Sequence, residues 1–287
     1  MQTPINLGAA WRFASEHLAR NDARRLVEYV CACRHADLLA HPERPLSAAE
    51  AAQLAALLER AAQGEPLAYL LGSACFYDLE FEVSPAVLIP RPETELLVSL
   101  GLQALQETLQ GGVARPCVLE LGTGSGIVAV SLALHCAQAE INALDVSSAA
   151  LAIARGNAER HAAPVRLIES NWFAQLGAEF FGRSHLIVSN PPYIAHGDPH
   201  LSQNGLPFEP SMALSDGVAG GNGLSCIEQI ICAAPTYLSA QGHLLLEHGY
   251  DQAEQVRALL SENGFSQVRS WLDDNGIERV SGGRKAA

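Results

Sequence analysis

Apolar positions in residues 1–72 recur with the period of amphipathic helices. The spacing i, i+3, i+4, i+7 is met by Ala23, Leu26, Val27 and Val30. A further helix is predicted to begin after Ser47, because Ser47 and Glu50 have the spacing of a capping box. Gly64 predicts the end of that helix, and Pro66 predicts the first position of a short helix after it. We expect a small N-terminal helical-bundle domain, and the pattern alone fits either a stabilising cap or a partner-recognition module.

The pattern changes to alternation in residues 76–83. The apolar positions of this segment are Leu79, Phe81 and Val83. Alternation of this kind predicts a half-buried strand, and we expect it to lie in a β-hairpin linker over residues 73–88. The next segment, LIPRPETELL, cannot start as regular structure because two prolines flank Arg91, and a helix can begin from Glu93 onward.

From residue 117 onward, short apolar runs alternate with helical stretches. Strands are predicted at 117–120, 140–145, 165–169, 185–189 and 243–247, with two late strands at 267–271 and 278–282. Helices are predicted at 125–136, 148–161, 224–239 and 251–263. Strands that alternate with helices predict a parallel sheet covered on both faces, which the late strands would finish as a hairpin-like edge. The predicted fold is therefore α/β, with a doubly wound, mostly parallel sheet in a domain over residues 89–287.

Composition and charge narrow the class of protein. Hydrophobic residues make up 48% of the 287 residues and charged residues 17%, as in globular proteins. No apolar run approaches the ~18 residues that suggest a membrane span, and the N-terminus lacks the pattern of a signal peptide. The seven cysteines include no CxxC pair and the histidines lack metal-ligand spacing, so we expect free, buried thiols and no metal site. We therefore expect a cytoplasmic protein that does not bind a membrane.

The net charge of −13 also bears on partners. Phosphate contacts from Lys and Arg supply most of the affinity of proteins for bulk nucleic acid. The charge therefore argues against a stable nucleic-acid complex, although it leaves a local basic patch open.

The first candidate for chemistry is the stretch VLELGTGSGIVAV, which follows the strand at 117–120. Its glycines are Gly122, Gly124 and Gly126. They let the backbone approach a ligand closely and lead into the positive end of a helix. Asp145 ends the next strand, where a carboxylate can accept both hydroxyls of a ribose. The pattern predicts a nucleoside site at the carboxyl edge of the sheet, and NAD competes less well because Ile127 replaces the third glycine of the dinucleotide fingerprint.

The run from Glu120 to Gly126, ELGTGSG, resembles the hallmark of S-adenosylmethionine (AdoMet)-dependent methyltransferases, an acidic residue followed by three alternate glycines. The sulfonium of AdoMet is positive, so nearby carboxylates attract it. The resemblance implies AdoMet as cofactor and S-adenosylhomocysteine as product. The cofactor-binding residues that we expect are Glu120, Gly122, Thr123, Gly124, Ser125, Gly126, Asp145, Asn171, Trp172 and Asn190.

The second candidate is Asn190-Pro191-Pro192-Tyr193, which ends the strand at 185–189. If the sheet reverses its order between its first and fourth strands, this motif lies beside the glycine loop. The Asn190 side chain and the Pro191 carbonyl offer two acceptors that can grip one NH2 group and turn its lone pair toward a methyl group. Tyr193 can pack against the flat group that carries the nitrogen. A rigid turn is the alternative, but with the glycine loop upstream we favour catalysis by Asn190, Pro191 and Tyr193.

Most of the chain resembles the peptide-chain release factor glutamine methyltransferase (PrmC/HemK) family. The matching segments are the N-terminal helical domain, FEVSPAVLIPRPETELLV at 81–98, SNPPYI at 189–194, FEP at 208–210 and LLLEHGYDQ at 244–252. The resemblance implies methyl transfer to the glutamine of the GGQ motif of class 1 release factors, with the helices of 1–72 recognising the substrate. The alternatives left open are an amino-group methyltransferase of adenine or guanine in nucleic acid and an AdoMet-binding scaffold without turnover.

The same resemblance implies roles for individual residues. The substrate-binding residues that we expect are Asn190, Pro191, Pro192, Tyr193, Arg91, Pro92, Glu93, Phe208 and Glu209, with Pro210 beside them. Asn171 departs from the family pattern, which has Asp there, so an acceptor for the adenine amino group would lack charge assistance. No strong general base is evident, and we interpret Glu247 and His248 as structural or substrate-edge residues.

Overall fold

The computed structural model describes residues 4–286, and the chain divides into two compact units, residues 1–73 and 74–287. The hairpin that we assigned to a separate linker lies, apart from Ser73, in the second unit. The functions that we expect of the two parts stay predictions.

The first unit is built from short helices around its own apolar core. They are α1 (Leu7–Ser15), α2 (Arg20–Val30), α3 (His35–Ala40), α4 (Ala48–Ala62) and α5 (Leu67–Leu71). The predicted apolar stripe is buried along α2. The capping box before α4 is formed as predicted, because Ser47 accepts from the Glu50 N–H at 3.2 Å and Glu50 accepts from the Ser47 N–H at 2.7 Å. Pro66 precedes α5 as its N-cap, one position earlier than expected.

The second unit begins with a two-stranded hairpin of β1 (Ser73–Phe76) and β2 (Leu79–Glu82). The prediction of one strand over 76–83 was wrong at its N-terminal end, because β1 ends at Phe76 and β2 begins only at Leu79. Tyr77 and Asp78 form the turn, and both have the positive φ, 50° and 61°, that tight hairpin turns require. The alternation is correct after the turn, since Phe81 and Val83 are buried.

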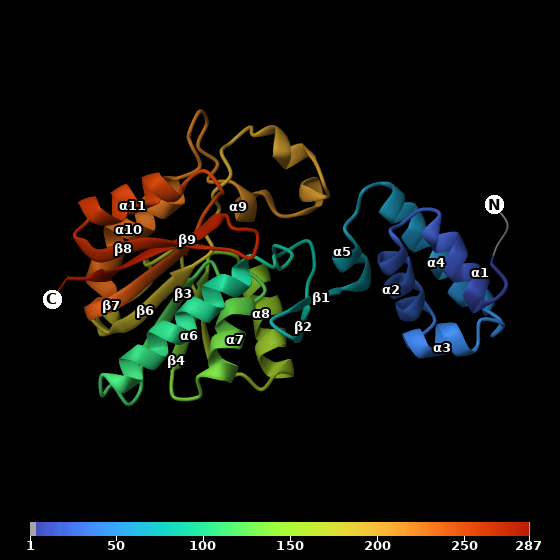
Figure 1. Ribbon diagram of the computed structural model, residues 1–287, viewed down its shortest axis with the longest axis horizontal. Helices are drawn as coiled ribbons and strands as arrows, with labels where there is room; N and C mark the ends of the chain where they lie inside the picture. Colours follow the sequence, from blue (N-terminus) through green and yellow to red (C-terminus); the bar gives the residue numbers. More distant parts are fainter. Residues whose placement is uncertain (1–3, 287) are drawn as a thin grey trace. The chain divides into compact units, whose positions relative to one another are not determined.

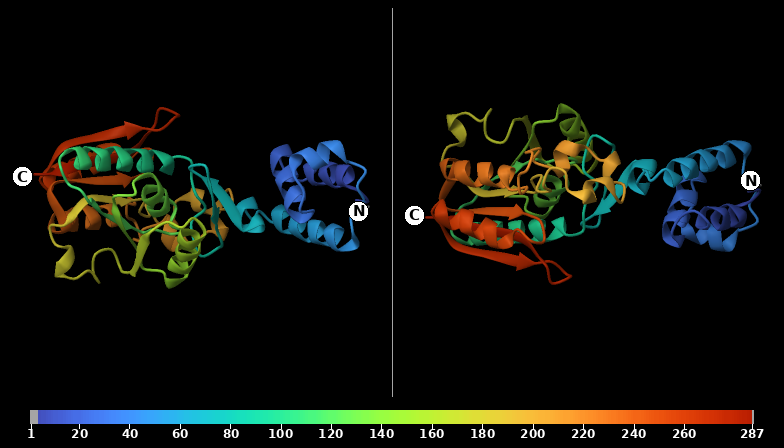
Figure 2. Two further views of the ribbon diagram at one scale, coloured as in Figure 1. Left: turned by 90° about the horizontal axis from the view of Figure 1, so that it is seen from below. Right: turned by 90° about the horizontal axis from the view of Figure 1, so that it is seen from above.

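A seven-stranded sheet forms the centre of the second unit, in the order β5-β4-β3-β6-β7-β9-β8. Its strands are β3 (Cys117–Leu121), β4 (Glu140–Asp145), β5 (Val165–Glu169), β6 (Ser184–Ser189), β7 (Leu238–Glu247), β8 (Phe265–Leu272) and β9 (Glu278–Lys285). Five strands run parallel, namely β5, β4, β3, β6 and β7 in the order of the sheet. Strand β9 is antiparallel to both β7 and β8. Figure 2 shows the antiparallel β8–β9 pair at one edge of the sheet.

Helices cover both faces of this sheet, as predicted for a doubly wound fold (Figure 1). The longer helices are α6 (Thr94–Gln110), α7 (Ile127–His135), α8 (Ser148–Arg160), α10 (Ser225–Tyr237) and α11 (Ala253–Glu262). One core packs α6 and α7 against Val118 and Leu186, and the other packs α10 and α11 against Leu119 and Ile187. Neighbouring strand residues thus serve opposite cores, because side chains alternate across a strand.

Between β5 and α10, the segments on either side of β6 contain only short helical turns. They are η1 (Ala178–Phe180), η2 (Pro199–Ser202), η3 (Leu206–Phe208) and α9 (Ser211–Leu214). The helix predicted at 224–239 is shorter than expected, because β7 already begins at Leu238. In the described residues no helix is long and apolar enough to span a bilayer. All seven cysteines are free, but Cys75 and Cys232 are exposed, which corrects the expectation of burial for these two.

Candidate active site

A cavity of about 530 Å³ opens at the carboxyl ends of β3, β4 and β6 in the second unit. The sheet changes its order here, since β4 and β6 lie on opposite sides of β3, as the sequence predicted. Ser189 joins the two central strands at this point, donating from its hydroxyl to the Leu121 carbonyl at 2.7 Å. Both predicted motifs therefore end at one cavity, which is the usual place for ligands in such sheets.

One side of the cavity, the glycine-loop wall, comprises Glu120, the loop Gly122–Ser125, Asp145, Asn171 and Trp172. Gly126 starts α7 just behind it, with φ +83°. A Cβ there would lie 3.2 Å from the Cβ of Ala154 on α8, so glycine permits both the turn and the close helix packing. The sequence motif thus folds the backbone tightly over the ends of β3 and β4.

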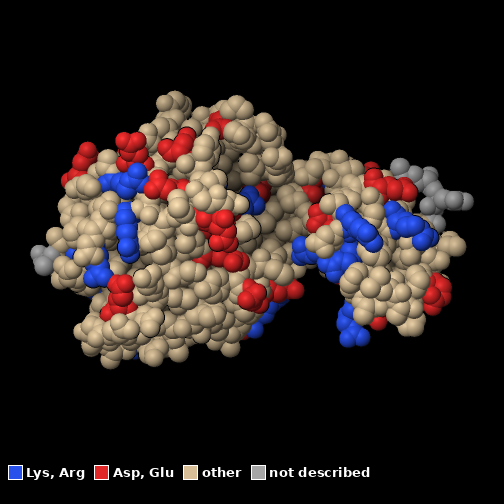
Figure 3. Space-filling model, viewed as in Figure 1, with Lys and Arg blue, Asp and Glu red and all other residues tan. Residues whose placement is uncertain are grey.

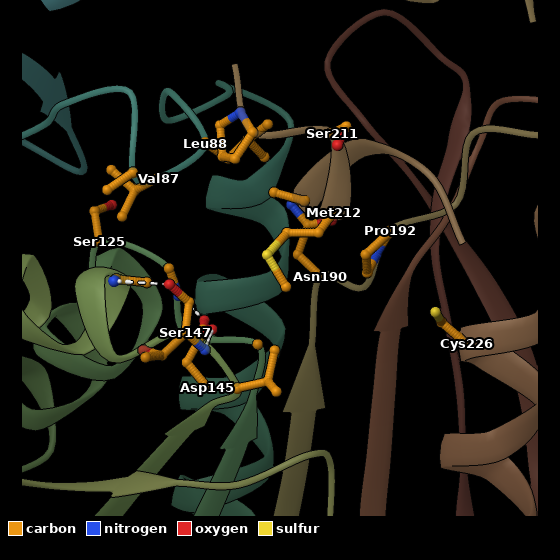
Figure 4. Close-up of a pocket in the computed structure, with 18 of the residues that line it drawn as sticks. Val87, Leu88, Ser125, Asp145, Ser147, Asn190, Pro192, Ser211, Met212 and Cys226 are labelled. Carbon is orange, nitrogen blue, oxygen red and sulfur yellow. Dashed lines mark hydrogen bonds between the residues drawn. The ribbon is translucent and has the colours of Figure 1, made fainter. Parts of the chain in front are cut away.

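Asp145 is held by backbone donors on both sides (Figure 4). The Gly124 N–H donates to Oδ2 at 2.8 Å and the Ser147 N–H donates to Oδ1 at 2.9 Å. Burial raises the pKa of Asp145, while these N–H groups oppose the rise. Each oxygen keeps a lone pair for a further donor, so the carboxylate fits the two hydroxyls of a ribose.

Glu120 lies deeper in the same wall and is 3% exposed. Burial raises its pKa to about 8, and the Thr123 hydroxyl, which donates to Oε2 at 2.7 Å, opposes the rise. A buried carboxyl with so few donors suits a cationic ligand, because a positive charge would stabilise its ionised form.

Trp172 closes the glycine-loop wall in a left-handed conformation, with φ +48°. The hydroxyl of Ser170 donates to the Trp172 carbonyl at 2.7 Å and holds this turn. The indole ring packs against Gly122, where an added Cβ would lie 3.6 Å from it. Asn171 is exposed and lines the cavity, and its backbone N–H donates to Gln175 Oε1 at 2.7 Å.

On the facing side, Asn190 and Pro192 line the cavity (Figure 4). Together with Thr94, which also lines it, they form the NPPY wall. Asn190 donates from Nδ2 to the Thr94 hydroxyl oxygen at 3.2 Å, and in the part of the chain described here its Oδ1 accepts no bond. An amide oxygen at the end of a strand is therefore available to a ligand in the cavity.

Tyr193 is placed differently from our expectation. It does not line the cavity with Asn190, and neither does Pro191, which is buried. The Tyr193 ring packs on the apolar core under α10, and its hydroxyl donates to Glu247 Oε1 at 3.4 Å. Its backbone carbonyl accepts from Gln252 Nε2 at 2.9 Å. In this structure Tyr193 holds the NPPY motif through contacts outside the cavity and does not form a wall beside the substrate position.

The segment before α6 is joined to the FEP stretch by one buried carboxylate. Glu209 accepts from the Arg91 guanidinium at 2.5 Å and from the Ile89 N–H at 3.0 Å. Arg91 and Pro210 line the cavity, whereas Pro92, Glu93, Phe208 and Glu209 do not. The predicted substrate residues are thus brought together, but only part of the set faces the cavity.

Several cavity or supporting residues were missed by sequence reasoning. They are Thr94, Ser211, Met212, Glu247 as an anchor, Gln252 and Gly223. Thr94 stands within the PRPET stretch and was the one with a usable signal, a hydroxyl next to the predicted substrate residues. Within residues 4–286, no group of His, Cys, Asp and Glu side chains could hold a metal ion.

Comparisons with known proteins agree with this fold. The family model of the PrmC N-terminal domain matches residues 9–72, and that of the methyltransferase small domain matches residues 97–204. A methyltransferase from Pyrococcus furiosus has a similar fold, with a TM-score of 0.52 at 18% identity over 74% of this chain and 92% of its own. The 16S rRNA N2 G1207 methyltransferase of T. thermophilus has a TM-score of 0.52 at 22% identity over 74% of this chain and 49% of its own.

Relatives at higher identity share a single name. The release factor glutamine methyltransferase of Burkholderia pseudomallei is 47% identical over 92% of this chain and 91% of the relative. The protein of that name from Bordetella pertussis is 48% identical over 94% and 96%, and that from Xylella fastidiosa (strain Temecula1) is 44% identical over 99% and 98%. Because this identity extends over nearly the full length of this chain and of each relative, the chain belongs to the release factor glutamine methyltransferase family.

Proposed function

We propose that this protein transfers the methyl group of AdoMet to the side-chain amide nitrogen of the GGQ glutamine in class 1 release factors. The observation that carries the proposal is the free Asn190 oxygen, which faces the glycine-loop wall across one cavity. The names of the relatives support the substrate. Since that substrate acts in translation, we also propose a cytoplasmic location.

The glycine-loop wall would hold the cofactor. Asp145 would accept the ribose hydroxyls, Trp172 and Asn171 would contact the adenine, and Glu120 would balance the positive charge. Bound AdoMet would supply an electrophilic methyl group. Methyl transfer would replace the sulfur–carbon bond with a nitrogen–carbon bond to the glutamine and leave S-adenosylhomocysteine as product.

The NPPY wall would orient the nucleophile. An amide nitrogen is a poor nucleophile, so its lone pair must be turned toward the methyl carbon and kept from water. Asn190 Oδ1 would accept one hydrogen of the NH2 group, whereas the Pro191 carbonyl, which we expected to accept the other, does not line the cavity in this structure. The methylated nitrogen then loses its extra proton to water, a step that needs no strong base. Arg91 and Pro210 would line the path by which the glutamine enters.

Methylation of an amino group in nucleic acid is the alternative that this chemistry also permits. The charge distribution weighs against it. Residues 74–287 contain 11 Lys and Arg but 23 Asp and Glu, whereas residues 1–73 contain 7 and 8. On the face seen in Figure 3, acidic side chains are spread over the second unit, and blue side chains gather mainly on the first. The second unit therefore carries a net negative charge, which weighs against a phosphate backbone as its ligand.

The test is a labelling assay with radioactive AdoMet and purified release factor. We expect one methyl group per release factor and no labelling when the GGQ glutamine is changed to alanine. Ribosomal RNA and DNA serve as competing substrates in the same assay. Labelling that persists in the alanine variant, or that goes to nucleic acid instead, would refute the proposal.

A further inference from the structure

The orientation of the Asn190 amide decides what the NPPY wall offers to a substrate. With Nδ2 toward Thr94, the oxygen faces the cavity as an acceptor. Turned by 180°, the same side chain would present two donors to the substrate NH2 group, which is itself a donor. Whatever fixes this orientation therefore acts on the reaction through Asn190.

Thr94 is the partner of Asn190 Nδ2. It begins α6, is 1% exposed, and has a single hydroxyl proton. A hydroxyl can accept from Nδ2 or donate to a flipped Oδ1, so Thr94 alone does not choose between the two orientations. The choice depends on where its proton goes.

Glu247 supplies a destination for that proton. It ends β7, is 1% exposed, and lies beside Thr94, whose hydroxyl lowers the Glu247 pKa as a hydrogen-bond donor does. Its Oε1 accepts from Tyr193 at 3.4 Å. Its Oε2 is buried and has no hydrogen-bond partner at regular geometry among the residues described. A buried carboxylate oxygen without a hydrogen-bond donor raises the free energy of the folded protein. The Thr94 hydroxyl proton is therefore more stable when it points toward Glu247.

We propose that Thr94 and Glu247 are positioning residues that hold the Asn190 amide with its oxygen toward the substrate nitrogen. The Thr94 proton goes to Glu247, and the Thr94 oxygen is left to accept from Asn190 Nδ2. Glu247 also holds Tyr193, so one carboxylate anchors both ends of the NPPY motif. This inference rests on the proposed function for the identity of the substrate.

The proposal has a dependence on pH. The groups that face Glu247 are Glu93 before α6, Tyr193 after β6 and Arg279 on β9. Burial, with a smaller contribution from the negative charge of Glu93, raises the Glu247 pKa to about 7. Protonated Glu247 no longer needs the Thr94 proton, which frees Asn190 to turn. Turnover at saturating substrates should therefore rise with pH through about 7.

Two variants at one position test the hydroxyl. Thr94→Val keeps the shape and removes the hydroxyl, whereas Thr94→Ser restores it. We expect Thr94→Val to lower kcat at least ~10-fold through misorientation of the acceptor, with the AdoMet Kd within ~2-fold of wild type. Thr94→Ser should recover most of kcat. Thr108→Val, on the same helix but away from the cavity, is the matched control and should leave kcat unchanged.

A second variant tests the carboxylate. Glu247→Gln keeps the shape and cannot ionise, so the rise of kcat between pH 6 and 8 should flatten relative to wild type. If Thr94→Val does not fold, this variant still tests whether Glu247 positions Asn190.

A third measurement is independent of turnover. The Asn190 side-chain NH2 resonances of 15N-asparagine-labelled protein should show slow hydrogen exchange that Thr94→Val abolishes. If wild type fails to methylate release factor, the proposed function falls, and the exchange measurement still decides the orientation. Wild-type kcat in Thr94→Val, equal loss of kcat in Ser and Val variants, or unchanged NH2 exchange would overturn the inference.

Discussion

The two walls of the cavity are built in different ways. In the glycine-loop wall, bonds join residues that are close in sequence: Thr123 and Glu120 are 3 positions apart, and Gly124 and Asp145 are 21 apart. In the NPPY wall, Asn190 donates to Thr94 across 96 positions, and behind that wall Tyr193 donates to Glu247 across 54. The two bonds of the first wall form within one strand–loop–helix–strand unit, β3–α7–β4, whereas those of the second need strands and helices far apart in the sequence.

This difference suggests a division of labour. The glycine-loop wall presents backbone and two carboxylates, which suit tight binding of a small cation with ribose hydroxyls. The NPPY wall presents one oriented amide, which suits alignment of a nucleophile. Changes in the first wall should appear in cofactor affinity, and changes in the second should appear in turnover.

The largest expected effect is that of Asn190→Ala. The lost acceptor orients the substrate nitrogen, so we expect kcat to fall by about 10²–10³-fold, comparable to removal of one oriented group from an active site. The AdoMet Kd should change less than ~3-fold. Steady-state rates with release factor and calorimetry with AdoMet measure the two quantities. Asn171→Ala, from the opposite wall, is the control and should show the reverse pattern; equal losses in both quantities for Asn190→Ala would remove the distinction between the walls.

Asp145→Ala should produce the next largest effect, and this effect should be on the AdoMet Kd instead of on kcat. Loss of two charge-assisted hydrogen bonds should raise the AdoMet Kd by roughly 10–100-fold. The kcat at saturating AdoMet should stay within a few-fold of wild type. Calorimetric titration measures the affinity, and Asp145→Asn, which keeps one acceptor oxygen, should fall between. A variant that binds AdoMet normally but has lost turnover would place Asp145 with the reacting groups instead.

The contrast between the walls also explains which features could be predicted from the sequence. The glycine loop and Asp145, which local motifs single out, lie together at the carboxyl edge of the sheet, and their roles stay predictions. The change of strand order was correct. Thr94 was not assigned a role, because it looks like an ordinary helix start. Glu247 was interpreted only as a structural or substrate-edge residue, because it looks like an ordinary strand end. Tyr193 was misplaced because its hydroxyl partner lies on β7, beyond the reach of any local pattern. The β1–β2 turn was missed because Tyr77 and Asp78 adopt positive φ without a glycine.

Gly223 tests how closely the NPPY motif must be packed. It has φ +78°, and a Cβ there would lie 2.2 Å from the Tyr193 carbonyl oxygen and 3.0 Å from the Ala195 nitrogen. Gly223→Ala must therefore shift the motif, and we expect kcat to fall about 10-fold with little change in AdoMet Kd. Gly220→Ala is the matched control, because Gly220 has φ +71° and no atom within 4 Å of the added Cβ.

Both glycine variants should lose roughly 1 kcal/mol of stability from the left-handed backbone. Only Gly223→Ala should lose turnover as well. Thermal unfolding and rates measured side by side separate the two contributions. An equal loss of turnover in Gly220→Ala would show that general destabilisation, and not the position of Tyr193, limits the reaction.

The smallest expected effect concerns Glu120 in the glycine-loop wall. Its pKa of about 8 means that much of the free protein has this group protonated at neutral pH. If the cationic cofactor needs the ionised form, binding releases a proton and tightens as pH rises. The AdoMet Kd should then fall about threefold between pH 7.5 and 8.5, by linkage. The amino group of AdoMet titrates in the same range and also contributes to proton release. The protons released by Glu120 are therefore the difference between wild type and Glu120→Gln. Calorimetry in buffers of different ionisation enthalpy measures proton release in each protein. If proton release is the same in both proteins, the charge of Glu120 does not act on the cofactor, and the affinity of this wall comes from Asp145 and the backbone.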